Sequence, residues 1–299
     1  MHSTNSFIYT VIERIRGYLD DPDLDAKYTD DFLIRHIIMP SMTNVMARIN
    51  NSLTNPVVSK LLISTVKDTQ YYQLPPTVGE IWGVTEYDTD TGDITRDYKP
   101  RSHWSPDGPN WSLEGNLLSI RPIPAKAQDI YIFYTHTGDL LLHYGAGTLD
   151  SDLTTFTLAT SPTLGAIDKR ANAYAGSILR LLSGNVIEER VVESSTANEY
   201  TGSIELTVRV PFAHNSAGAV TYEVAPLNSQ ALYEAVAASG ALKLASYKKI
   251  TGTHFQMIQL QYKDAMKTAA DHYANIQMRT PKHLDKDTVD NSDNRSFII

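Results

Sequence analysis

The sequence predicts an α+β fold: a helical bundle built from N- and C-terminal helices, with a small β-hairpin region and an inserted β domain between them. Apolar residues recur every three or four positions near both ends of the chain, as on one face of a helix. Short segments rich in β-branched and aromatic residues fill the middle, separated by Gly, Pro, Asp and Asn. With 42% hydrophobic and 20% charged residues, the chain can bury a core.

Two helices are predicted in the N-terminal part. Residues 5–19 place their apolar side chains on one helix face. A second helix should begin near Thr29, because its hydroxyl can cap free amides and the two aspartates that follow suit the helix dipole. Pro40 should kink or end this helix, since proline lacks an N–H and clashes with the preceding turn. The apolar pattern then continues to about Asn55.

Strands are predicted from about 61 to 135 and again, in the inserted part, from about 154 to 224. The stretch 167–182 could also be read as a helix, but Gly176 and Ile178 favour a strand in its second half. Gly145-Ala146-Gly147 is typical of a hinge between domains.

Helical periodicity returns after Pro226. One helix should begin at Asn228 or Ser229 and end near Ile250, and another should run from Thr253 to about Met278. The polar stretch that follows is expected to be disordered alone. We therefore predict four parts: 1–137 with the N-terminal helices and hairpins, 138–227 as the inserted β domain, 228–280 completing the bundle, and a tail at 281–299.

Composition limits the chemistry. The chain has no cysteine, which excludes disulfides, thiolate metal sites and a cysteine nucleophile. A net charge of −8 makes it a poor general binder of nucleic acid, although an acidic wall could line a channel through which DNA slides. No apolar run reaches the roughly 18 residues of a transmembrane helix, so we expect a soluble protein with no membrane contact and no targeting segment.

Possible reaction and metal centres have simpler explanations. Asp88, Asp90 and Asp93 lie around a glycine, but their spacing departs from a calcium loop and favours a hairpin turn. The nine histidines are scattered, and no metal site is expected. Ser246 and Lys249 have the Ser-x-x-Lys spacing of some acyl enzymes, yet an exposed basic turn explains them better. We expect no cofactor and no enzymatic activity.

Contact surfaces are the more informative candidates. Aromatic residues near a Pro/Gly-rich loop are expected to contact a neighbouring subunit or the tail, since exposed Trp and Tyr are enriched at interfaces. These residues are Tyr98, His103, Trp104 and Trp111. Stacking on sugars is the alternative, which would make the β domain a carbohydrate-binding or cell-surface module. The basic cluster of Lys243, Lys248 and Lys249 could contact DNA in a channel or form salt bridges between subunits.

The segment 61–137 carries a resemblance. Its elements are Tyr72-Gln73-Leu74-Pro75, Ile81-Trp82-Gly83-Val84, Trp111-Ser112-Leu113-Glu114-Gly115-Asn116 and Leu118-Ser119-Ile120-Arg121-Pro122-Ile123-Pro124, followed by Ile130-Tyr131-Ile132-Phe133-Tyr134. In order and turn chemistry they resemble the central region of head-to-tail adaptor proteins of tailed bacteriophages. Residues 148–226 are similar to a β module that recurs in phage virion proteins, through Tyr174-Ala175-Gly176, Ser183-Gly184, the strand 204–210 and Tyr222-Glu223-Val224.

The resemblance implies a structural protein of the virion, made in the host cytoplasm and placed at the head–tail interface. Such adaptors form a homo-oligomeric ring, of twelve copies in this family, that docks on the portal protein and connects it to tail or nozzle proteins. Genomic DNA would pass through the lumen without specific binding. We expect the tail to fold on the portal and to fill an apolar groove there, through Arg295, Phe297, Ile298 and Ile299.

Overall fold

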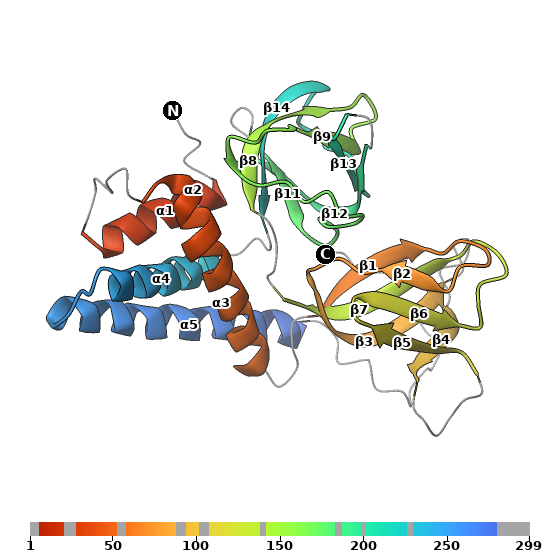
Figure 1. Ribbon diagram of the computed structural model, residues 1–299, viewed down its shortest axis with the longest axis horizontal. Helices are drawn as coiled ribbons and strands as arrows, with labels where there is room; N and C mark the ends of the chain where they lie inside the picture. Colours follow the sequence, from red (N-terminus) through yellow and green to blue (C-terminus); the bar gives the residue numbers. More distant parts are fainter. Residues whose placement is uncertain are drawn as a thin grey trace.

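The structure is a computed structural model with three parts: a helical layer and two β modules (Figure 1). It describes residues 6–20, 28–52, 58–87, 94–101, 108–137, 142–182, 187–198, 201–225 and 230–279. The helical layer consists of α1 (Phe7–Tyr18), α2 (Asp30–Phe32), the π-helical segment η1 (Leu33–Ile38), α3 (Met39–Ser52), α4 (Gln230–Tyr247) and α5 (Thr253–Arg279).

Capping side chains set the helix starts. The Ser6 hydroxyl accepts a hydrogen bond from the Tyr9 amide at the start of α1. The Thr29 hydroxyl accepts one from the Phe32 amide, so the predicted cap at this position is confirmed. The helix that begins there does not end at Pro40 but runs on into α3, after the wider turn of η1.

Helix α4 is the centre of the helical layer. It contacts α1, α3 and α5, and from Ala235 to Ala245 its alanines are buried. Gly240 lies where α1 and η1 cross it, because a Cβ there would come within 2.8 Å of the Ile15 Cδ1 atom and 3.0 Å of the Ile37 Cγ2 atom. Small residues on α4 therefore let helices from both ends of the chain approach closely.

The first β module is a seven-stranded sheet in the order β1-β7-β3-β4-β5-β6-β2. Its strands are antiparallel except for the pair β4–β5. The predicted turn at Glu114-Gly115-Asn116 joins β5 to β6, with Gly115 at φ +65°. The strands are β1 (Val58–Ser64), β2 (Tyr71–Gln73), β3 (Val78–Tyr87), β4 (Ile94–Pro100), β5 (Asn110–Glu114), β6 (Leu117–Arg121) and β7 (Asp129–His136).

The second β module is a closed barrel. Six strands follow one another in the order β8-β14-β11-β12-β13-β9, and pairing of β8 with β9 closes the ring, with β10 beside β8. The core contains Phe156, Tyr174 and Tyr222, all fully buried. The strands are β8 (His143–Leu149), β9 (Thr155–Leu158), β10 (Leu164–Gly165), β11 (Ile178–Leu181), β12 (Glu188–Ala197), β13 (Ile204–Val208) and β14 (Gly218–Ala225).

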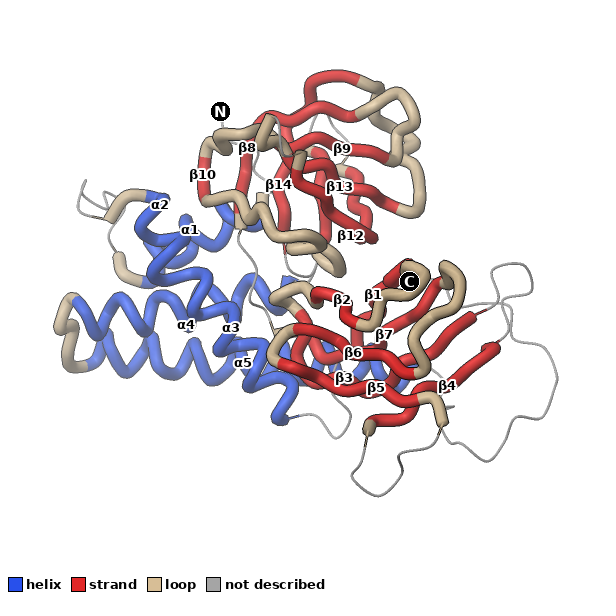
Figure 2. The backbone as a smooth tube through the Cα atoms, turned by 45° about the vertical axis from the view of Figure 1, so that its right-hand side comes forward, coloured by secondary structure: helices blue, strands red, loops and turns tan. Residues whose placement is uncertain are grey.

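The predicted fold class is wrong. The described chain is mostly β, with two seven-stranded sheets, one of which closes into a barrel, and the helices form a smaller layer beside them (Figure 2). The reason is that β1 and β3 both pair with β7 across long sequence separations, which no local pattern reports. The predicted hinge at Gly145-Ala146-Gly147 is also wrong, because these residues lie inside β8.

Candidate functional site

A groove lies where α3 meets the first sheet, and we call it the Trp82 groove. It has a volume of about 510 Å³, and Trp82 in its wall is 50% exposed. The Asn50 amide nitrogen donates to the carbonyl of His136 at 3.1 Å and so fixes α3 against the end of β7. Among the described residues that line it, Glu80 alone is an acidic or basic side chain other than histidine; these residues are Thr43, Ala47, Asn50, Asn51, Glu80, Trp82, Thr135, His136 and Thr137.

The outer face of the first sheet shows aromatic and aliphatic side chains beside this groove. Val58 and Ile94 are exposed at its margins. Across its first two strands, β1 and β7, the Lys60 ammonium lies 3.4 Å from the centre of the Tyr131 ring, and Tyr87 packs edge-on against Tyr131. Burial, followed by the nearby Arg209 charge, lowers the pKa of Lys60. This sheet face therefore combines a cation–π contact with exposed apolar side chains.

A second apolar surface lies at the turn between α4 and α5, which we call the hairpin end. Tyr247, Met257 and Leu260 there are each more than half exposed. The sequence from 246 to 263 contains three lysines and no acidic residue, although the whole chain carries a net charge of −8. Both views place this turn at the left extreme of the molecule, with the first sheet on the right (Figures 1 and 2). The hairpin end thus exposes apolar side chains next to charges of both signs, because Asp264, one turn after Leu260 on α5, is exposed beside Lys263.

Buried charges join the barrel to the helical layer. Glu223 on β14 is fully buried and accepts hydrogen bonds from the Ser6 hydroxyl at 2.5 Å and the Phe7 amide at 2.7 Å. It is also paired with Arg180 of β11, whose Nε donates to Glu189 at 2.8 Å. A carboxylate from the barrel therefore caps the start of α1, where the helix dipole favours negative charge.

Two further buried carboxylates hold loops and strands in place. Glu188 accepts from the amides of Ala213 and His214, each at 2.8 Å, and from the Asn215 side chain at 2.7 Å. Burial raises the pKa of Glu188, but these hydrogen bonds outweigh burial, so the pKa of this carboxyl lies below its usual value. Glu86 accepts from the Tyr98 hydroxyl at 3.0 Å. The carboxylate oxygens of these residues accept hydrogen bonds from donors of the same chain, which favours structural roles for them over acid–base catalysis.

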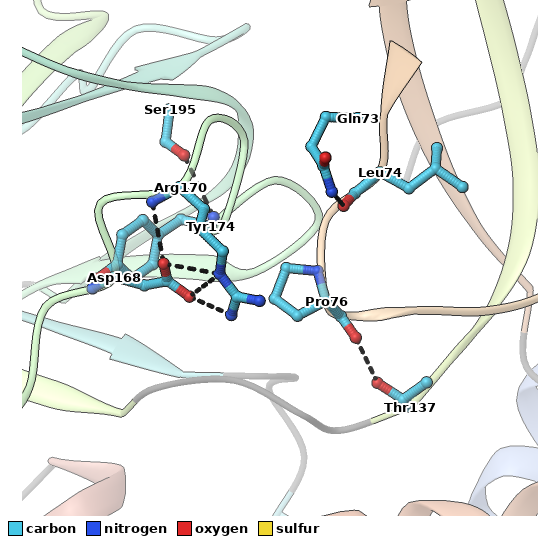
Figure 3. A network of polar contacts seen from close by, with 8 residues as sticks. All are labelled: Gln73, Leu74, Pro76, Thr137, Asp168, Arg170, Tyr174 and Ser195. Carbon is cyan, nitrogen blue, oxygen red and sulfur yellow. Dashed lines mark hydrogen bonds and ion pairs between the residues drawn. The ribbon is translucent and has the colours of Figure 1, made fainter. Parts of the chain in front are cut away.

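The two β modules face each other across a set of polar contacts (Figure 3). In the barrel, the Asp168 carboxylate accepts from Arg170, whose guanidinium points toward Pro76 of the first module. The Thr77 hydroxyl donates to the carbonyl of Ala175 at 3.3 Å, which links the modules directly. On the first-module side, Thr137 donates to the Pro76 carbonyl at 3.1 Å. Of these contacts, the Thr77–Ala175 hydrogen bond crosses between the modules, and the others order the segments on either side.

Two histidines are sealed inside the protein. His136 at the end of β7 is fully buried, which lowers its pKa to about 4. His143 at the start of β8 is also fully buried, which lowers its pKa to about 3, and its Nδ1 lies 3.2 Å from the Tyr222 hydroxyl. Both are therefore neutral at pH 7. Within the described ranges, no cluster of three or more His, Asp or Glu side chains could hold a metal ion.

No protein-family model and no curated protein matches this sequence. The helices of the described segments include none that is long and apolar enough to cross a membrane.

The predicted aromatic contacts are only partly described. Tyr98 is 2% exposed and lies in the core of the first module, so its side chain is not on the surface where we expected it. Trp111 is partly buried and packs against the same core. His103 and Trp104 lie outside the described residues, as do Asp88, Asp90 and Asp93 of the expected turn and the residues expected to dock on the portal, Arg295, Phe297, Ile298 and Ile299.

The three lysines of the predicted basic cluster have different surroundings. The Lys243 ammonium donates to the carbonyl of His36 at 2.7 Å. Lys243 on α4 therefore contacts the backbone of η1 and links these two helical segments. Lys248 lies over the Tyr28 ring, and Lys249 is exposed with φ +54°. Only part of the cluster therefore faces outward, at the hairpin end.

Sequence reasoning did not single out the Trp82 groove. Trp82 had been grouped with the apolar residues of its strand, although Ile81 and Val84 are the ones that point inward. Trp82 follows the buried Ile81 and stands two positions after the acidic Glu80. Because alternate residues of a strand point to opposite faces, this spacing predicts that Trp82 points outward. The groove's other wall comes from α3, and no local pattern shows that this helix meets β7.

Proposed function

We propose that this protein is a structural component of a tailed bacteriophage, a ring-forming adaptor that docks on the portal and connects it to the tail. The observation that carries the proposal is the presence of two different surfaces with exposed apolar side chains, the Trp82 groove where α3 meets the first sheet and the hairpin end at the α4–α5 turn. When two different surfaces join copies of a protein head to tail, the copies form a ring if the rotation between neighbours closes on itself.

The use of charge in the fold supports a structural role. Glu86, Glu188 and Glu223 are each held by donors of the same chain. The segment that resembles phage adaptors, from Leu61 to Thr137, forms one continuous module whose strands pair with one another. A compact module of this kind can present the same face in every copy of a ring.

Portal attachment is tested by deletion of residues 281–299. We expect the truncated protein to keep the circular dichroism spectrum and unfolding midpoint of the full chain, because the deleted residues follow the end of α5 at Arg279. In sedimentation with the portal of the same phage, the full chain should comigrate with the portal and the truncated chain should not. Failure of the full chain to bind the portal would refute the adaptor function, and normal docking of the truncated chain would refute the role of the tail.

A further inference from the structure

We draw no further inference here: the strongest candidate, the Trp82 groove where α3 meets the first sheet, carries no proposal, because nothing in the structure shows what covers its exposed tryptophan.

Discussion

Replacing Glu223 by alanine should be among the most destabilising changes to the barrel. The substitution leaves the Arg180 guanidinium, whose side chain is 6% exposed, without its buried partner and removes the acceptor for the Ser6 hydroxyl and the Phe7 amide. Breaking a buried ion pair by removing one partner costs about 3–5 kcal/mol. Loss of a helix cap costs about 0.5–2 kcal/mol, and the two effects overlap because they share one carboxylate.

Glu189 limits the loss, because it keeps its hydrogen bond to the Nε of Arg180 and is itself partly exposed. We therefore expect a decrease of about 3 kcal/mol in the free energy of unfolding, measured by urea titration followed by circular dichroism. Glu205→Ala is the matched control, since Glu205 is an exposed carboxylate of the same barrel, and it should change stability by less than about 0.5 kcal/mol.

A double variant tests the reason for the loss. Glu223→Ala/Arg180→Met removes both charges and should recover much of the stability that the single variant loses, because no unpaired charge remains buried. Amide exchange at Phe7 and Ile8 should accelerate in both variants, since the cap of α1 is absent in both. A loss below about 1 kcal/mol in the single variant, or one equal to that of Glu205→Ala, would show that the pair does not hold the barrel to the helices.

Two other changes probe packing and titration. Gly147→Ala should destabilise the barrel by about 1–3 kcal/mol in urea titration, because its Cβ would come within 2.5 Å of the Phe156 Cζ atom, whereas Gly17→Ala, with nothing within 4 Å, should be neutral or stabilising; equal effects would contradict the packing described. His136 and His143 have folded pKa values of about 4 and about 3, below the 6.5 of the unfolded chain. Below pH 6.5 the unfolded chain therefore takes up protons that the folded chain does not. The free energy of unfolding should fall as the pH falls from 6.5 toward 4, by up to about 1.4 kcal/mol per pH unit for each histidine. His143→Gln should flatten this dependence between pH 7 and 5, and an unchanged slope would contradict the assignment.

Local signals in the sequence predict much of the secondary structure. Thr29 has the residue type and the following acids of a helix start, and its cap forms. Glu114-Gly115-Asn116 has the chemistry of a tight turn and joins two paired strands. The second half of 167–182 contains the expected strand, because Gly176 adopts φ +80° and ends any helix before it. Each of these features depends on a few neighbouring residues.

Features that depend on distant residues could not be predicted in this way. β8 contains two glycines that suggested a hinge. At position 147, however, no larger residue fits, because Phe156 of β9 lies against Gly147 where the barrel closes. Lys243 was grouped with basic surface residues, and its role at the His36 carbonyl depends on a helix that lies about 200 residues earlier. The Trp82 groove requires α3, β3 and β7 to meet. Such arrangements follow from the tertiary fold, and local periodicity contains no trace of them.

Self-association is the central claim, and the most direct measurement is the mass of the native assembly. Native mass spectrometry and negative-stain imaging of the full chain, alone at rising concentration and mixed with the portal, should reveal one discrete closed multimer with a central opening. Leu260→Asp should reduce that multimer to monomers without unfolding them, because the side chain is exposed. A full chain that remains a monomer under all of these conditions would contradict the account.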